Sequence, residues 1–254
     1  MGGGVISRGA FIRAGALAAG GLLLGGRGLA RAQAGAGVPQ RGDSLDSLVL
    51  DGSDIVGSPF LMRGARNTKR VALTFDDGPS PGVTNRVLET LRKYKVRATF
   101  FMIGQRVVES PGLAKEVQAA GHELANHSFT HPTLGSLSAD RVASELHLCQ
   151  DAIEKHVGVR PSWLRPPYGS FKTSQGPIAR SERLGVVIWS VDPRDWARPG
   201  VAAIQQRVLG GTAGGDIILC HDLHSQTADA APGMIEGLLE RGFQPGTLSD
   251  LVLG

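Results

Sequence analysis

The sequence predicts an α/β fold, a closed or nearly closed (β/α) barrel of about seven parallel strands. Three observations support this prediction: short apolar runs recur from Thr68 onward, stretches of helical period lie between them, and reactive polar residues follow several runs. Strands that alternate with helices usually pair in parallel, and strands that are apolar throughout are buried on both faces. The 254 residues are enough for one large α/β domain.

The expected strands are, in chain order, "RVALTF" (70–75), "ATFFMI" (98–103), "HELAN" (122–126), "SWLRP" (162–166), "GVVIWSV" (185–191), "DIILCH" (216–221) and "GFQPGTL" (242–248). Between them, apolar residues that recur every three or four positions predict amphipathic helices. The clearest of these are "TNRVLETLRKYK" (84–95), "GLAKEVQAAG" (112–121), "ADRVASELHLCQDAIEKH" (139–156) and "APGMIEGLLERG" (231–242).

The first 34 residues have the features of an export signal. Two arginines, Arg8 and Arg13, precede the apolar run "AGALAAGGLLLGG" (14–26), and the pattern Ala-Gln-Ala predicts cleavage after Ala34. The run has 13 residues, whereas a membrane-spanning helix needs about 20, so a retained anchor is the alternative. We therefore expect an exported protein, in the periplasm, the cell wall or the extracellular space. Gly9 stands where a twin-arginine signal has its second arginine, which leaves the export route open.

Composition then divides the rest of the chain. Residues 35–67 are rich in Gly, Ser and Asp and predict a linker or wrapping arm, which leaves residues 68–254 as the main folded domain. The net charge of +4 arises in the first 34 residues, which hold four of the 27 basic residues and no acidic one. The remaining 23 basic residues balance 23 acidic ones, so the charge does not favour a nucleic-acid partner.

The two cysteines, Cys149 and Cys220, lie in predicted regular segments and are expected to be buried thiols. A disulfide between them is the alternative, because connectivity cannot be read from sequence. They lack the spacing of a redox motif or a disulfide framework, which disfavours a redox or structural protein of that kind.

Residues capable of chemistry lie where the expected strands end. Asp76 and Asp77 follow the first strand, His127 the third, Arg165 the end of the fourth, Asp192 and Asp195 the fifth, and His221 the sixth. The C-terminal ends of barrel strands open on one rim, so these side chains are expected to meet in one cleft.

The motif "HSFTH" (127–131) places two imidazoles four residues apart, so one helical turn or a tight loop can direct both at a common point. Two histidines with one carboxylate leave a coordination position open, which is the pattern of a catalytic zinc site. In "DDGPS" (76–80), a cation would bind one of the adjacent carboxylates and leave the other free to accept a proton from water. The alternative is that "DDGPS" is only a polar turn.

Three further motifs add charge and donors. Arg165 in "RPPYG" (165–169) can hold a carboxylate, and the restricted backbone can offer an amide to an oxyanion; an ordinary ion pair is the alternative. A carboxylate of "DPRDW" (192–196) can keep His221 protonated, ready to donate to a leaving nitrogen. "HDLH" (221–224) as a second metal pair is the less favoured interpretation. Three histidines are assigned ordinary structural roles: His122, His147 and His156.

With five motifs in this order, "TFDDG", "HSFTH", "RPPYG", "DPRDW" and "ILCH", the chain resembles the polysaccharide deacetylases of carbohydrate esterase family 4, the NodB homology domain. The resemblance covers about residues 68–254. It implies a distorted (β/α) barrel with the active site at the C-terminal strand ends, and hydrolysis of N-acetyl or O-acetyl groups on sugars. It also implies a divalent metal, usually Zn²⁺, with Co²⁺, Ni²⁺ or Fe²⁺ as alternatives.

The resemblance further implies a role for each site residue, and no catalytic position departs from the family pattern. Asp77, His127 and His131 would bind the metal; Asp76, held by Arg165, would be the general base; His221, oriented by Asp195, would be the general acid; the backbone amide of Tyr168 would stabilise the oxyanion; and Trp196 and Leu219 would line the acetyl pocket.

The leading hypothesis is a metal-dependent N-deacetylase whose partner is an acetylated polysaccharide that contains N-acetylglucosamine, such as peptidoglycan or an exopolysaccharide. The alternatives are an O-acetyl xylan esterase and a carbohydrate-binding pseudoenzyme on the same fold. Loops such as "SFKTSQGP" (170–177) carry no readable code for the polymer, and the sequence does not indicate the oligomeric state.

Overall fold

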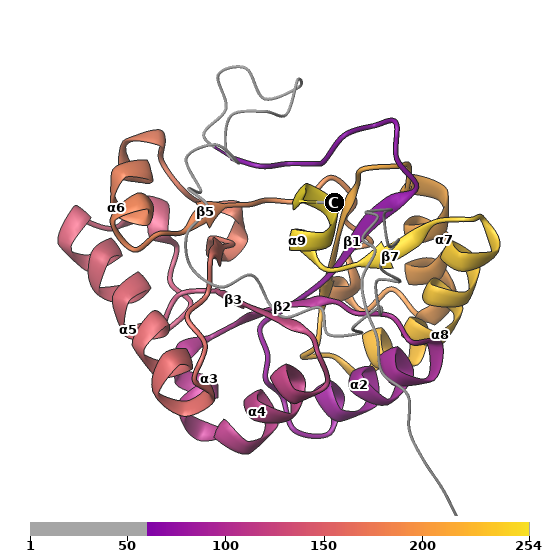
Figure 1. The fold of residues 1–254 in the computed structure, drawn as a ribbon, viewed down its shortest axis with the longest axis horizontal. Coiled ribbons are helices and arrows are strands. Elements are labelled where there is room, and N and C mark those ends of the chain that lie inside the picture. The colour runs from indigo at the N-terminus through magenta and orange to yellow at the C-terminus, as the bar shows by residue number, and fades with distance from the viewer. Residues whose placement is uncertain (1–59, 254) are drawn as a thin grey trace, which may run out of the picture. The chain divides into compact units, whose positions relative to one another are not determined.

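The computed structural model describes residues 60–253, in which strands and helices alternate along the chain (Figure 1). The strands are β1 (Arg70–Asp76), β2 (Thr99–Met102), β3 (Glu123–Asn126), β4 (Trp163–Leu164), β5 (Gly185–Val186), β6 (Ile217–His221) and β7 (Gln244–Gly246). The α-helices are α2 (Val83–Tyr94), α3 (Gly104–Glu109), α4 (Pro111–Ala119), α5 (Ala139–Val157), α6 (Gly176–Ser181), α7 (Val201–Gly211), α8 (Ser225–Glu240) and α9 (Leu248–Leu253).

The seven strands form one parallel sheet that curls into a distorted barrel, which confirms the predicted fold class. Six strands follow the order β5-β4-β3-β2-β1-β6, and β7 pairs with the first half of β1. Beyond β5 the chain runs back toward β6, where Val191 and Ile218 form an isolated parallel bridge. The barrel is therefore closed by a single bridge where a regular barrel would have a full strand pair.

Strand β1 lies at the centre of the sheet. Residues 71–76 are all buried, because β1 pairs with β2 on one side and with β6 on the other. In this register Asp76 lies opposite Phe101 of β2 and His221 of β6. The three strands consequently end at the same level, and residues far apart in sequence share one rim.

Alternation along β1 separates two cores. Leu73 and Phe75 belong to the cluster between the sheet and its helices, whereas Ala72 belongs to the cluster on the opposite face. Figure 1 shows helices α5, α3, α4, α2 and α8 in this order along the outer side of the strands. The opposite face is covered in part by α9, which contributes Leu248 and Leu251.

All seven expected strands are present, with different lengths. The fifth was expected over 185–191, but regular pairing ends at Val186, and the following residues make only isolated bridges to Leu61 and Ile218. The seventh ends at Gly246, and Leu248 begins α9. These are the places where the barrel departs from regular geometry.

Three of the four expected helices match within two residues at each end, as α2, α4 and α5. The fourth, α8, begins at Ser225 and not at residue 231, and Pro232 lies inside it. Because proline is favoured in the first turn of a helix, Pro232 indicates a start near residue 231 and hides the actual start at Ser225. Helices α3, α6, α7 and α9 were not predicted, because they are short or carry few buried residues.

The expected export signal and most of the expected linker lie outside the described residues. The described end of that segment pairs with the barrel, since the Leu61 amide donates to the Val186 carbonyl at 2.9 Å. Within residues 60–253 no helix is long and apolar enough to cross a membrane. Cys149 and Cys220 are buried free thiols, as expected, and burial raises the pKa of Cys149 to about 12.

Replacing the buried Leu73 with alanine is expected to lower the free energy of unfolding by about 2–5 kcal/mol, because a large-to-small change in a core leaves a cavity. Leu239 on α8 is 40% exposed, so Leu239→Ala is a matched control with an expected change within about 0.5 kcal/mol. Urea unfolding followed by circular dichroism measures both. Equal losses in the two variants would contradict the central position of β1.

Candidate active site

The adjacent carboxylates Asp76 and Asp77 lie at the C-terminal end of β1. Asp76 is the last residue of the strand, and Asp77 has a left-handed φ of 75°. The backbone turn gives the two side chains different partners: Asp76 pairs with Arg165, whereas Asp77 lies against His127 and His131. Neighbouring carboxylates can therefore do different chemistry.

The guanidinium of Arg165 is fully buried beneath the rim. Its Nη1 donates to Asp76 Oδ1 at 2.7 Å and to Thr74 Oγ1 at 2.8 Å, and its Nη2 donates to the Ile188 carbonyl at 2.9 Å. The guanidinium carbon also lies 4.1 Å from the centroid of the Phe101 ring. Buried charges are stable only when they are paired and hydrogen-bonded, so Arg165 and Asp76 fix each other in place.

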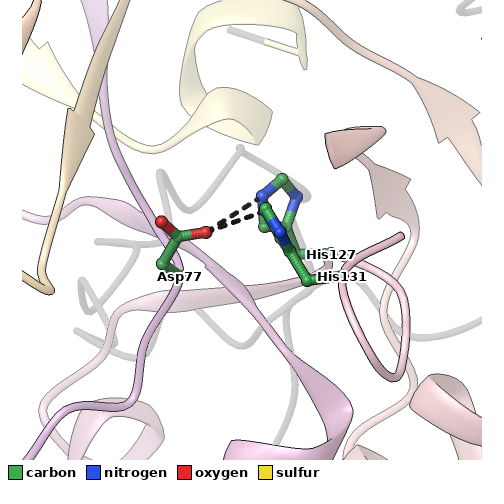
Figure 2. Close-up of side chains that lie close together, drawn as sticks. All are labelled: Asp77, His127 and His131. Carbon is green, nitrogen blue, oxygen red and sulfur yellow. Dashed lines mark ion pairs between the residues drawn. The ribbon is translucent and has the colours of Figure 1, made fainter. Parts of the chain in front are cut away.

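Asp77, His127 and His131 form a compact group of donor atoms (Figure 2). Asp77 Oδ1 lies 3.4 Å from His127 Nε2 and 3.1 Å from His131 Nε2, and the three candidate ligand atoms lie within 4.8 Å of one another. Burial by itself would raise the pKa of the Asp77 carboxyl, but the two imidazoles lower it well below its ordinary value. Asp77 is therefore an ionised carboxylate.

This donor set fits a divalent cation. His127 Nδ1 lies 2.6 Å from the Arg165 carbonyl oxygen, so Nδ1 donates a proton there, and Nε2, which faces Asp77, is the nitrogen that can offer a lone pair to a cation. Asp77 Oδ1 is buried and accepts no hydrogen bond from any residue that the structure describes. A buried acceptor without a donor is what a cation satisfies, and two imidazoles with one carboxylate are the donors of an open zinc site.

The loop that carries both histidines has an unusual backbone. Ser128 and His131 have left-handed φ angles of 63° and 61°, a conformation that costs a non-glycine residue about 1–3 kcal/mol. Local hydrogen bonds offset this cost: the Ser128 amide donates to Asn126 Oδ1 at 2.8 Å, and the His131 amide donates to Ser128 Oγ at 3.1 Å. The loop is thus held in a conformation that directs both rings to Asp77.

A second pair joins His221, the last residue of β6, to Asp195 in the turn Asp195–Ala197, beside Asp76. His221 Nδ1 lies 2.8 Å from Asp195 Oδ1, while the His221 amide and Thr227 Oγ1 donate to Asp195 Oδ2 at 2.8 and 2.6 Å. Burial opposes protonation of His221, but the hydrogen bond and charge of Asp195, with the charges of Asp76 and Asp77, raise its pKa to about 9. Burial would raise the pKa of Asp195, but His221 and Thr227 lower it. His221 is therefore an imidazolium at neutral pH.

The three residues predicted to contact the substrate are Tyr168, Trp196 and Leu219. Tyr168 is 70% exposed, has a left-handed φ of 59°, and its ring centroid lies 4.8 Å from that of His131. Trp196 is 47% exposed and follows Asp195 directly, whereas Leu219 is buried within β6. Their roles in substrate binding remain predictions.

His122 belongs to the core beside β2 and not to this group. His122 is buried, its Nδ1 accepts the Ala98 amide at 3.3 Å, and burial together with the charge of Arg97 lowers its pKa to about 4. In the part of the chain that the structure describes, the group of Asp77 is the one cluster suited to a metal, and it includes neither His221 nor His224. The arrangement thus gives no support to "HDLH" as a second metal pair.

Sequence reasoning missed three supporting residues. Thr74 and Thr227 bond Arg165 and Asp195 respectively, and Glu145 on α5 bonds the histidine loop. Glu145 carried a readable signal, because it lies among the apolar positions of its helix, where a charge requires polar partners. The two threonines carried none, since threonine is common in strands and helices without any such role.

Comparison with known proteins relates the chain to polysaccharide deacetylases. The sequence model of the family described as "Polysaccharide deacetylase" matches residues 63–187. The chain is 40% identical over 185 residues to the peptidoglycan-N-acetylmuramic acid deacetylase PdaC of Bacillus subtilis. The aligned region covers 73% of this chain and 39% of that protein. It is also 39% identical over 191 residues to a peptidoglycan-N-acetylglucosamine deacetylase of Bacillus cereus. In this case the aligned region covers 73% of this chain and 89% of that protein.

The chain spans about two fifths of the length of the first curated relatives that it matches. Among solved structures, a carbohydrate esterase family 4 pseudoenzyme of Bacillus anthracis matches with a TM-score of 0.73 and 36% identity, over 75% of this chain and 68% of that one. The same fold thus occurs with and without named activity, so the site residues must carry the functional argument.

In the metal-free protein the imidazole of His221 is expected to titrate near pH 9, as NMR of the ring protons would show. Asp195→Asn should move this midpoint down toward the ordinary value of about 6.5, because it removes the anionic partner. Folding raises this pKa, so protonation of His221 beside Asp195 contributes to the free energy of unfolding. This contribution is complete below about pH 6.5 and is lost as the pH rises through about 9. The titration midpoint of His122 should be the same in the wild type and in Asp195→Asn, so it is the internal reference. An unchanged His221 midpoint in Asp195→Asn would refute the pairing.

Proposed function

Because this chain belongs to the polysaccharide deacetylase family, we propose that it is a metal-dependent hydrolase that removes N-acetyl groups from a polysaccharide containing N-acetylglucosamine, peptidoglycan or an exopolysaccharide. One observation carries the proposal. A carboxyl group paired with a buried arginine, a group of donor atoms suited to a cation and a histidine paired with an aspartate lie on one rim of the barrel. Amide hydrolysis needs these three functions together: a base, an electrophile and an acid.

Asp77, His127 and His131 would hold the cation, with Zn²⁺ the first candidate and Co²⁺, Ni²⁺ or Fe²⁺ the alternatives. When bound, such a cation supplies Lewis acidity and lowers the pKa of a water molecule toward 7. The contribution of the protein is to fix the ligands. The Arg165 carbonyl orients the ring of His127, so that Nε2 faces the site.

Asp76 would act as the general base. Its Oδ1 is occupied by Arg165, and its Oδ2 lies 3.8 Å from His127 Nε2, on the side of the cation-binding group. Arg165 compensates the charge of this buried carboxylate and prevents its rotation. Asp76 would take a proton from water as the water oxygen bonds to the acetyl carbon.

His221 would act as the general acid. Its ring is protonated at neutral pH, and Asp195 holds Nδ1, which leaves Nε2 to donate. As the bond between the acetyl carbon and nitrogen breaks, this proton goes to the departing nitrogen, which leaves as a free amine while the acyl part leaves as acetate. The register that sets Asp76 opposite His221 supports a base and an acid on either side of one acetamido group.

Substrate binding would involve three residues. The backbone amide of Tyr168 would donate to the developing oxyanion, and Trp196 and Leu219 would line the pocket for the acetyl methyl. The exposure of Trp196 and Tyr168 supports a site open to a polymer, because exposed large apolar side chains often mark the place where a ligand binds.

We propose that the protein acts outside the cytoplasm. The basic and apolar N-terminal residues support export, and relatives named as peptidoglycan deacetylases would meet their substrate in the cell envelope. The pseudoenzyme alternative is disfavoured by the complete set of charged residues at the rim.

The proposed activity is tested by acetate release from chitooligosaccharide and from peptidoglycan. We expect release from at least one N-acetylated polymer with Zn²⁺ or Co²⁺, loss of activity with chelator, and recovery when metal is returned. Acetylated xylan is the comparison substrate, and faster release from it would favour the O-acetyl esterase alternative. No release at any metal loading would leave the pseudoenzyme alternative.

The division of roles between Asp76 and Asp77 is tested by two variants. Asp76→Asn should keep metal binding and lose about 10²- to 10⁴-fold in kcat, because the amide cannot accept the proton. Asp77→Ala should lower metal affinity instead, since it removes a ligand. Metal content by elemental analysis and kcat at saturating metal separate the two effects. The reverse pattern would exchange the assignments.

A further inference from the structure

The loop that carries both histidines is bonded to a buried carboxylate on helix α5. Glu145 Oε2 accepts the amide hydrogens of Phe129 at 3.0 Å and of Thr130 at 2.8 Å, and Oε1 accepts the Thr130 hydroxyl at 2.7 Å. The bonded residues lie between His127 and His131. One carboxylate therefore fixes the part of the loop that sets the spacing of the two imidazoles.

The burial of this carboxylate is compensated by hydrogen bonds and by no ion pair that the structure describes. Glu145 is 4% exposed, yet no lysine, arginine or histidine pairs with it in the part of the chain that is described. A buried charge without a counter-ion is unfavourable unless hydrogen bonds satisfy it. Here all of the compensation comes from the histidine loop, so Glu145 and the loop depend on each other.

Helix α5 holds the start of the same loop as well. Asn126 Nδ2 donates to the Leu146 carbonyl at 3.0 Å and to Gln150 Oε1 at 3.3 Å, while Asn126 Oδ1 accepts the Ser128 amide. The loop is thus tied to α5 before and after Ser128, whose left-handed backbone would relax if it were free.

We propose that Glu145 is a positioning residue for the cation site: through Phe129 and Thr130 it keeps His127 and His131 directed at Asp77 and so sets the affinity for a divalent cation. The inference rests on the proposed metal function of these three ligands. Glu145 acts from behind the ligands and touches neither the cation nor the substrate. Residues in this position commonly change metal affinity by one to two orders of magnitude.

The test is a titration of the metal-free full-length protein with Co²⁺, followed by the visible absorption of the bound ion and by competition with a chelator. Glu145→Ala should weaken Co²⁺ binding by about 10- to 100-fold. Glu145→Gln should stay within about threefold of the wild type, because its carbonyl can accept both amides and its NH₂ can donate to the Thr130 hydroxyl. Equal losses in both variants would overturn the hydrogen-bond explanation.

Glu154→Ala is the matched control, since Glu154 is an exposed glutamate on the same helix, paired with Arg160. It should leave Co²⁺ affinity unchanged. Circular dichroism checks folding; if Glu145→Ala does not fold, Thr130→Val removes one of the three bonds and should weaken binding severalfold. If folded Glu145→Ala binds Co²⁺ as tightly as the wild type, the role of Glu145 is overturned while the proposed metal function stands. Thr130→Val decides in the same way if Glu145→Ala does not fold. Absence of Co²⁺ binding by the wild type would overturn the proposed function with it.

Discussion

The buried ion pair between Arg165 and Asp76 is the interaction on which the rim of the barrel depends. The guanidinium joins the end of β1 to Ile188 after β5, and the carbonyl of the same residue lies against His127. One residue thus fixes the candidate base and one candidate metal ligand at once. Removing one partner from a buried pair typically costs about 3–5 kcal/mol, because the other charge is left uncompensated. The arrangement of the site is therefore coupled to the stability of the fold.

Around this pair, carboxylates outnumber the cations that could balance them. Asp222 follows His221, is fully buried, and its Oδ1 has no hydrogen-bond partner among the described residues. Burial, with the charges of Asp77 and Asp76, raises its pKa to about 7, although its hydrogen bond with Thr84 opposes the shift. Repulsion of this kind is what a divalent cation beside Asp77 would relieve, so the electrostatics of the rim agree with the donor geometry.

The sequence predicts the strands and their common rim well, because strands buried on both faces leave little choice but apolar residues. It predicts less where few residues of an element are buried: α7 buries only Ile204 and Val208 and shows no clear apolar stripe. The candidate residues were found because reactive side chains follow strand ends. Alternation along a strand indicates that Asp76 and Asp77 point in different directions, but periodicity does not give the left-handed φ of Asp77, which directs its side chain to the two histidines.

The residues that hold the site were harder to find for a physical reason. Glu145 is 15 residues from Thr130, and Thr227 is 32 residues from Asp195, so each hydrogen bond exists only after a helix has packed against the sheet. A catalytic constellation tolerates errors of only about 0.5 Å, and that tolerance is met by these distant supports more than by the reactive residues themselves. Two chains with the same motifs can therefore differ in activity when the helices behind the motifs differ.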